Sequence, residues 1–342
     1  MMLPQSFKLP NGMTIPAIGL GTFEAVGDHS STKDAVLYAL SVGYRHFDTA
    51  FNYENESFVG AAIRESGIPR EQISVTTKLS TCWHRPGDVQ EALQRSLNTL
   101  GLDYAVPIAV DYYLMHWPHC YVVEGPDRER LTEDTLSGKK PVIDYKLSRD
   151  YVEVWRAIEA LVDSGMTKAI GVSNFNILKL KRLLSHARIR PAFLQVELHP
   201  YLPQYELLDY CRSENLHVQA HQPLGGNPPS KSGPHPDIPG PMRDDKVKSL
   251  AAQKNTSPAQ VLLSWAVSRG TSAVPKSSQP KHIDSNIKLI GLSKADITVL
   301  DHTRKQDDFI RYLDPQDYLG FDIFNEEADE PVADEPPWRK PK

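Results

Sequence analysis

Short β-rich runs of apolar residues recur along the chain, and a longer segment with helical spacing of apolar positions follows them. This alternation predicts βα units around a parallel sheet. We expect eight strands, at residues 15–21, 44–50, 73–79, 110–117, 169–174, 193–199, 217–223 and 271–276. The clearest helical segment covers residues 151–164, where the apolar positions share one face and Gly165 follows as a stop signal.

Eight βα units in a chain of 342 residues favour a closed barrel over an open, doubly wound sheet. No expected strand is followed by the G-x-G-x-x-G turn of a Rossmann site, and residues 19–22 hold only a fragment of it. We therefore predict an α/β protein with a (β/α)8 TIM barrel, as one domain over residues 1–342 with a core at about 7–308. Residues 309–342 are expected to form a C-terminal loop and tail, and the charged, proline-rich end at 326–342 to be mobile.

Three segments do not fit the eight units. Residues 7–16 hold two short runs around the Asn-Gly pair at 11–12, which favours a type I′ turn, so a β-hairpin is expected to plug one barrel end. Residues 118–149 are polar and charged, and residues 225–241 are dense in Pro and Gly. These two segments are expected to be long loops at the C-terminal face of the barrel, because loops of this length are usually functional or disordered.

The net charge of -5 and the pI near 6.2 argue against nucleic acid or an anionic membrane as the main partner, and leave a small molecule as the expected one. The N-terminus lacks a signal-peptide pattern, and no apolar stretch reaches the roughly 18 residues of a membrane span, so we expect a cytoplasmic protein. The three cysteines, Cys82, Cys120 and Cys211, are odd in number and widely spaced. They are expected to be buried or incidental free thiols.

Four polar side chains are expected to converge at the ends of neighbouring strands. They are Asp48, Tyr53, Lys78 and His116. Taken singly, a lysine at a strand end is more often solvated and a lone histidine is more often structural. Because barrel enzymes keep their reactive groups at the carboxyl ends of the strands, the four together predict a proton-transfer site.

The residue types suit the reduction of a carbonyl. A phenol has an ordinary pKa near 10, and Lys78 is expected to lower the pKa of Tyr53 so that it can donate a proton. Asp48 would keep Lys78 charged, and His116 would align the carbonyl oxygen, while the hydride must come from a cofactor. A metal-dependent hydrolase is the alternative, but the strand ends lack H-x-H and H-E-x-x-H spacing, so no metal is expected.

These residues resemble the motifs of the aldo-keto reductase superfamily, which includes the aldose and aldehyde reductases, over nearly the whole chain. The matching motifs are residues 43–50 with Tyr53 and 55–56, then 114–118, 170–175, 195–200 and 274–277. The resemblance implies reduction of an aldehyde or ketone to an alcohol, with NADPH as cofactor and NADH possible. It also implies a monomer and a catalytic tetrad of Asp48, Tyr53, Lys78 and His116.

The same resemblance assigns the cofactor site. It implies that Ser173, Asn174 and Gln195 bind the nicotinamide carboxamide, that Lys276 and Ser277 bind the adenosine 2′-phosphate, and that Asn286 contacts adenine. The other residues it implies at the cofactor are Gly21, Thr22, Asp48, His221, Gln222, Leu224, Gly226 and His282.

Two of these positions depart from the family pattern. His221 stands where the family has a stacking Tyr, and an imidazole titrating near pH 6.5 would repel an oxidised nicotinamide when protonated. We therefore expect oxidised cofactor to bind worse at acidic pH. His282 replaces an Arg that clamps the 2′-phosphate, so discrimination between NADPH and NADH is expected to be weakened.

The substrate is not identified by the sequence, and an aldehyde, a sugar and a polyketide-like ketone remain open. Four aromatic residues that follow strand ends, Phe23, Phe51, Trp83 and Trp117, are expected either to line the substrate pocket beside Tyr53 and His116 or to pack at the barrel end. A regulatory subunit, which keeps the cofactor site as a redox sensor and acts by binding a partner protein, is a second alternative function. The acidic tail leaves room for such a partner.

Overall fold

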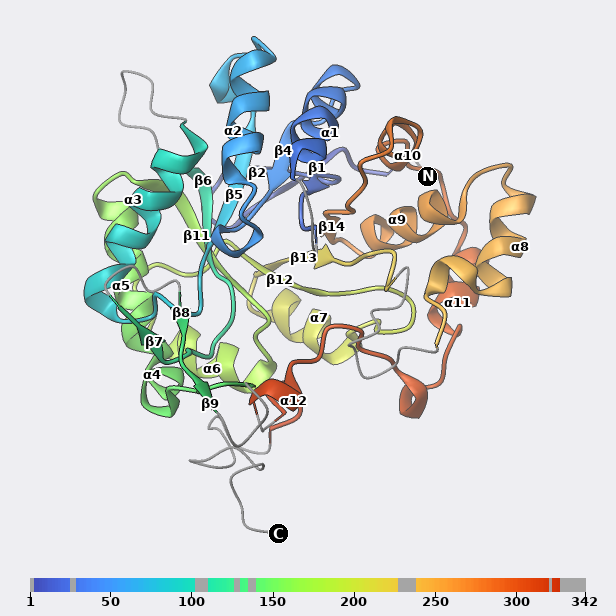
Figure 1. Cartoon of the computed structure of the whole chain (residues 1–342). Coiled ribbons are helices and arrows are strands. Elements are labelled where there is room, and N and C mark those ends of the chain that lie inside the picture. The colour runs from blue at the N-terminus through green and yellow to red at the C-terminus, as the bar shows by residue number, and fades with distance from the viewer. Residues whose placement is uncertain are drawn as a thin grey trace.

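The computed structural model describes residues 3–24, 29–101, 110–125, 130–134, 140–226, 238–319 and 322–326 (Figure 1). Eight parallel strands form one sheet in the order β14-β13-β12-β11-β6-β5-β4-β3. Their bounds are β3 (Leu20–Gly21), β4 (His46–Asp48), β5 (Ser74–Leu79), β6 (Val110–Met115), β11 (Thr167–Ser173), β12 (Phe193–Glu197), β13 (His217–His221) and β14 (Ser272–Ala273). Parallel bridges from Ile18 to Ala273 and from Gly21 to Lys276 join the two edges, so the sheet closes and the predicted (β/α)8 barrel is confirmed.

A glycine allows this closure. The N–H of Gly21 donates to the carbonyl of Pro275 at 3.0 Å. A Cβ atom at position 21 would lie 2.7 Å from the carbonyl oxygen of Val274, which is closer than such atoms approach in proteins. The first strand is also shorter than predicted, because Ile15 pairs within the N-terminal hairpin and the regular strand covers only Leu20–Gly21, with an isolated bridge at Ile18 before it.

Helices surround the sheet (Figure 1). They are α1 (Ser30–Ser41), α2 (Glu56–Glu65), α3 (Val89–Leu100), α5 (Tyr151–Asp163), α6 (Ile177–His186), α7 (Tyr205–Ser213), α8 (Asp245–Gln253), α9 (Pro258–Ser268), α10 (Pro280–Asn286) and α11 (Lys294–Asp301). In α5 the apolar face predicted from the sequence is buried, and Trp155 and Ile158 pack in the core. Gly165 adopts φ +75° just after this helix, as its stop signal predicts.

The N-terminal hairpin closes one end of the barrel, as predicted. It pairs β1 (Ser6–Lys8) with β2 (Thr14–Pro16), and the Tyr112 hydroxyl inside the barrel donates to the carbonyl of Thr14 at 2.9 Å. The predicted type I′ turn is wrong, because only Gly12 of the Asn-Gly pair has a positive φ, of +87°. The loop instead has three residues, closed by a bond from Leu9 N to Met13 O, which is typical of a type I turn with a glycine bulge.

The polar segment at 118–149 is more structured than a plain loop. Two short antiparallel pairs lie there, β7 (Val123–Glu124) with β8 (Arg130–Leu131) and β9 (Glu133–Asp134) with β10 (Lys140–Pro141), followed by α4 (Tyr145–Arg149). Strands of two residues carry no periodic signal, so the sequence did not predict them. Most of the predicted loop at 225–241 lies outside the described residues.

The C-terminal segment, of which the structure describes residues 309–319 and 322–326, folds back on the barrel beside α4 and α6 through α12 (Gln316–Leu319) (Figure 1). Tyr145 donates to Leu319 O at 3.5 Å, and the buried Glu326 pairs with Lys179 of α6 at 2.7 Å. The prediction of a mobile tail is therefore wrong at Glu326, because an ion pair and packing hold it. The remainder of that prediction, 327–342, lies outside the described residues.

Two further predictions can be compared with the described part of the chain. Cys82, Cys120 and Cys211 are free thiols, and the last two are buried, as expected. None of the helices in the described ranges combines the length and the apolar character needed to cross a lipid bilayer.

Candidate active site

The structure brings together the four side chains singled out from the sequence. Asp48 ends β4, Lys78 lies near the end of β5, His116 follows β6, and Tyr53 ends the short 3-10 helix Phe51–Tyr53. Strands β4, β5 and β6 are adjacent and parallel, so their carboxyl ends meet at one edge of the barrel. The Tyr53 and His116 rings lie 5.6 Å apart, edge to face.

Lys78 is the centre of this group. Its side chain has no exposed surface, and its ammonium Nζ donates to Asp48 Oδ1 at 2.6 Å, Thr49 O at 2.9 Å and Tyr53 Oη at 3.3 Å. Burial disfavours the charge, but Asp48 and Tyr53 outweigh it and raise the pKa of Lys78 above its ordinary value. Lys78 is therefore a fixed cation inside the barrel at neutral pH.

Tyr53 does not have the lowered pKa that the sequence argument expected. Burial raises the pKa of the phenol, and Lys78 lowers it only in part, so the net shift is upward. The cause is that moving a phenolate from water into the barrel interior costs more free energy than its attraction to the Lys78 ammonium regains. Lys78 still opposes the burial, and it lies within hydrogen-bonding distance of the oxygen that would become negative.

His116 is neutral at physiological pH. Burial, and then the Lys78 charge, lower the pKa of its imidazole well below the ordinary value. A neutral imidazole has one N–H donor and one acceptor nitrogen. His116 can therefore donate a hydrogen bond to an oxygen beside Tyr53, but it is a poor source of a proton.

The residues assigned to the nicotinamide carboxamide adjoin this group. Gln195 donates from Nε2 to Asp48 Oδ2 at 2.6 Å, and Asn174 donates from Nδ2 to the carbonyl of His116 at 3.0 Å and to Ser173 Oγ at 3.1 Å. The Asn174 N–H also donates to the Gln195 carbonyl at 3.0 Å, so five residues at or just after the ends of β4, β6, β11 and β12 are linked by hydrogen bonds at one end of the barrel. Gln195 also donates to Gln219 on β13, a contact that the sequence did not suggest.

His221 differs from its sequence-based expectation. Burial lowers the pKa of its imidazole to about 4, so the predicted titration near pH 6.5 is wrong. Its Nε2 lies 3.0 Å from Asn174 Oδ1, which only accepts hydrogen bonds, so Nε2 carries the hydrogen of the neutral ring. His221 is thus an uncharged ring fixed beside the carboxamide-binding residues.

Two buried oxygen atoms support a fit to a dinucleotide. Asn286 on α10 is buried, and its Oδ1 has no hydrogen-bond partner among the described residues. The Oε1 atom of Gln222 is also buried and also has no partner among those residues. A buried acceptor without a donor is costly, and the amino group of adenine or the amide of nicotinamide would supply one. These side chains therefore fit the cofactor that the motifs imply.

The residues assigned to the adenosine phosphate lie at a narrow cleft between β3 and α1. Gly21, Thr22, Lys276 and Ser277 line it. Glu24 also lines this cleft, and its Oε1 lies 2.7 Å from Lys276 Nζ. Glu24 was missed from the sequence, although a charged residue just after a strand end was an available signal.

None of the other three predicted cofactor residues, His282, Leu224 and Gly226, lines that cleft. His282 is exposed on α10. Gly226 is buried, and a Cβ there would lie 2.9 Å from the Tyr312 ring, while Leu224 packs against the barrel core.

The aromatic residues predicted at the substrate divide into two groups. Phe23 is 53% exposed with its ring 5.0 Å from that of Tyr53, and Trp117 lies 6.4 Å from His116 and 6.2 Å from Phe324 of the C-terminal segment. Trp83 has no exposed surface; Phe51 lies 6.3 Å from it, and the Arg95 guanidinium stacks on its ring. Phe23 and Trp117 therefore border the site, while for Trp83 a packing role agrees best with its burial.

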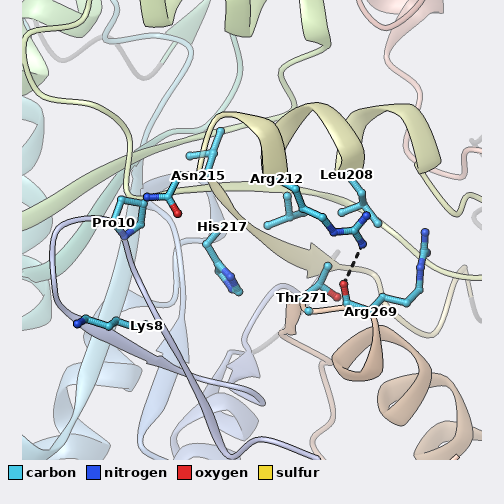
Figure 2. A pocket seen from close by; sticks show the side chains of 11 residues that line it. Lys8, Pro10, Leu208, Arg212, Asn215, His217, Arg269 and Thr271 are labelled. Atoms are coloured by element: carbon cyan, nitrogen blue, oxygen red, sulfur yellow. Dashed lines mark hydrogen bonds between the residues drawn. The ribbon is translucent and has the colours of Figure 1, made fainter.

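A larger cavity, of about 220 Å³, lies at the opposite end of the barrel (Figure 2). Lys8 and Pro10 of the hairpin, Arg212 of α7 and His217 at the start of β13 line it together with Arg269. The Arg212 guanidinium spans part of it and donates to the Arg269 carbonyl at 3.1 Å. Because it opens at the amino ends of the strands, this cavity is remote from the tetrad.

No cluster of three or more His, Cys, Asp or Glu side chains in the described ranges has the arrangement to hold a metal ion. Asp48, the acidic member of the tetrad, is already bound to Lys78 and Gln195. This end of the barrel therefore holds a phenol and an imidazole beside a buried, paired cation.

Comparison with known proteins agrees with this geometry. A family model, Aldo/keto reductase family, matches residues 17–305. The Gallus gallus protein named Aldo-keto reductase family 1 member A1 is 43% identical over 292 residues, which cover 83% of this chain and 84% of that protein. The Homo sapiens protein of the same name is 42% identical over 286 residues, which cover 82% of this chain and 83% of that protein. The solved aldose reductase of Schistosoma japonicum superposes with a TM-score of 0.81 at 32% identity, covering 95% of this chain and 99% of that chain.

Proposed function

The chain belongs to the aldo/keto reductase family, and we propose that it reduces an aldehyde or ketone to the alcohol, with hydride from NADPH or NADH and a proton from Tyr53. The observation that carries the proposal is the buried ammonium of Lys78, 3.3 Å from Tyr53 Oη and 2.6 Å from Asp48 Oδ1. A fixed cation beside a phenol at the catalytic end of a barrel is suited to proton donation. The small carbonyl compound is the partner we propose for this site.

Each residue of the tetrad has one task in the proposed reaction. A bound nicotinamide cofactor would supply the hydride for the carbonyl carbon. His116, as a neutral donor, holds the carbonyl oxygen next to Tyr53, and the Tyr53 hydroxyl gives its proton to that oxygen as negative charge develops on it. Lys78 stabilises the resulting phenolate until water restores the proton, and Asp48 keeps Lys78 charged and in place.

The residues that we assign to the nicotinamide lie at the same end of the barrel as the tetrad. Asn174, Ser173 and Gln195 have the donors and acceptors that a carboxamide requires, and Asn286 has a free acceptor suited to adenine. Lys276 provides a cation for the 2′-phosphate, which supports NADPH over NADH. His282 cannot make the bidentate contact of an Arg at its position, so we propose that the preference is modest.

The test follows the absorbance of NADPH with a panel of aldehydes and ketones for the wild type and Tyr53→Phe. The variant keeps the ring but removes the proton, so kcat should fall by about 10²- to 10⁴-fold, the usual contribution of a general acid. Tyr210→Phe is the matched control, because it removes a hydroxyl from the outer helix α7.

Unchanged turnover in Tyr53→Phe would refute the proton assignment. NADPH binding without turnover of any carbonyl would instead favour a barrel that senses the cofactor for a partner protein. A metal requirement without any response to a nicotinamide would favour a hydrolase.

A further inference from the structure

Glu24 holds the lysine that the proposed function assigns to the 2′-phosphate. Glu24 Oε1 lies 2.7 Å from Lys276 Nζ, and the two side chains are 19% and 37% exposed. Burial opposes ionisation of Glu24, but hydrogen bonding and charge from Lys276 hold the pKa of the carboxyl below its ordinary value. The carboxylate is therefore charged at neutral pH and neutralises Lys276.

The start of α1 fixes Glu24 in this position. The Ser31 hydroxyl lies 3.2 Å from both carboxylate oxygens, and the Thr32 hydroxyl lies 3.4 Å from Oε2. His29, at the N-cap of the helix, has its Nδ1 3.9 Å from Oε2. Because several groups of one helix hold the carboxylate, it is not a loose surface side chain that swings away at no cost.

The ion pair also narrows the cleft. Gly21, Thr22, Glu24, Lys276 and Ser277 enclose a space of about 10 Å³, close to the least that one water molecule requires. A phosphate that reaches Lys276 must therefore meet the Glu24 carboxylate. A phosphate monoester carries a charge of about −1.5 to −2 at neutral pH, so the two anions compete for one ammonium.

A ribose diol meets this carboxylate differently. Hydroxyl groups donate hydrogen bonds to carboxylates, and in Rossmann enzymes an acidic residue binds the ribose 2′-hydroxyl of NAD in this way. The anion that repels a 2′-phosphate is thus a good partner for an unmodified ribose. Glu24 can therefore weaken the binding of NADPH and strengthen the binding of NADH.

We propose that Glu24 is a specificity-determining residue, which weakens binding of the 2′-phosphate by occupying Lys276 and favours a cofactor with a free ribose 2′-hydroxyl. The inference rests on the proposed function for the location of the cofactor. It gives a second reason, besides the presence of His282 in place of an Arg, why the proposed preference for NADPH should be modest. It also predicts that the preference increases when the Glu24 charge is removed.

The test measures binding of two adenosine fragments that differ only in the phosphate at issue, adenosine 2′,5′-bisphosphate and adenosine 5′-monophosphate. Their dissociation constants are measured by calorimetry for the wild type and Glu24→Gln, which keeps the size and removes the charge. The variant should bind the bisphosphate about tenfold more tightly. It should bind the monophosphate equally or more weakly, so that the ratio of the two constants shifts.

Two controls separate this effect from structural damage. Glu65→Gln removes an equal charge from a surface pair with Lys33 and should leave both constants unchanged. Thermal unfolding of each variant reports whether loss of the Ser31 and Thr32 contacts loosens α1. In the double variant Glu24→Gln/Lys276→Gln, the gain for the bisphosphate should disappear, because the released ammonium is gone.

An equal change for both fragments, or no change for either, would overturn the role of Glu24 and leave the proposed reduction intact. Failure of both fragments to bind the wild type would instead argue against the proposed cofactor site. Because the fragments contain no nicotinamide, neither outcome depends on the Tyr53 chemistry.

Discussion

Lys78 keeps its charge inside the barrel because Asp48 lies 2.6 Å from its ammonium nitrogen. Removing one member of a buried ion pair leaves an uncompensated charge, which costs about 3–5 kcal/mol. We expect Lys78→Met to lower the free energy of unfolding by about that amount at pH 7, measured by urea titration.

The double variant Asp48→Asn/Lys78→Met is the informative comparison. It removes both charges, so it should be more stable than Lys78→Met alone, although it will not reduce carbonyls. Lys33→Met, which breaks an exposed pair with Glu65, should cost less than about 1 kcal/mol. Equal losses for the single and double variants would contradict a charge-based explanation.

His221 is the second residue whose environment sets its chemistry. Its pKa is lowered to about 4, so the ring is neutral above about pH 5 and carries a positive charge only below that range. We therefore expect the ratio of the dissociation constants of NADP⁺ and NADPH to stay constant from pH 5.5 to 8. Fluorescence titrations across this range measure the ratio, with His221→Gln as a variant that cannot titrate. A ratio that changes near pH 6.5 in the wild type, but not in the variant, would show that His221 keeps an ordinary pKa.

The C-terminal segment is held to the barrel by a carboxylate at the end of β12. Glu197 Oε1 accepts from His199 Nε2 at 2.8 Å and from Tyr312 N at 2.7 Å, and its Oε2 accepts from Leu313 N at 2.8 Å. Burial raises the pKa of Glu197, but His199 and then the Arg311 charge outweigh it and lower the pKa to about 2. This contribution to stability is present above about pH 4.5 and is lost as the pH falls toward 2.

Glu197→Gln should therefore be less stable than the wild type at neutral pH, by about 3 kcal/mol if the pKa shift is realised in full. The difference should shrink between pH 4.5 and 2, because the unfolded chain then binds a proton at Glu197 while the folded wild type stays ionised until about pH 2. Urea unfolding at pH 7 and pH 3 measures it. Glu214→Gln, on an exposed pair with Arg190, should change stability by less than about 1 kcal/mol at both pH values. A deficit in Glu197→Gln that is equal at pH 7 and pH 3 would contradict this account.

The elements of this fold differ in how far the sequence specifies them. The barrel strands and α5 were predictable because burial imposes a period on their apolar residues, and Lys78 could be assigned to the site because it lies at a strand end. The strands β7 to β10 were not predictable, since two residues carry no period. Glu24 was missed for another reason: its partner Lys276 is 252 positions away, and only the closure of β3 on β14 brings them together.

With the tetrad as the proposed catalytic group, stability and chemistry are assigned to opposite ends of the barrel. At the amino ends of the strands, the hairpin buries Leu9 and Ile15 against Tyr112 and Phe193. At the carboxyl ends, Trp117 lies 6.4 Å from His116 of the tetrad and 6.2 Å from Phe324 of the C-terminal segment. In barrels of this kind the second end carries the catalytic groups and the first contributes mainly stability.

This separation gives a paired prediction. Ile15→Ala removes a fully buried side chain from the hairpin end and should lower the free energy of unfolding by about 2–5 kcal/mol, with kcat/KM unchanged. Phe324→Ala removes a half-buried ring beside Trp117, so it should cost less stability but alter KM for bulky carbonyls more than for small aldehydes. Urea unfolding and a substrate panel on both variants measure the two effects. If Ile15→Ala reduced kcat/KM for the folded enzyme as strongly as it reduced stability, the hairpin would be coupled to the tetrad through the barrel interior, and the two ends would not be independent.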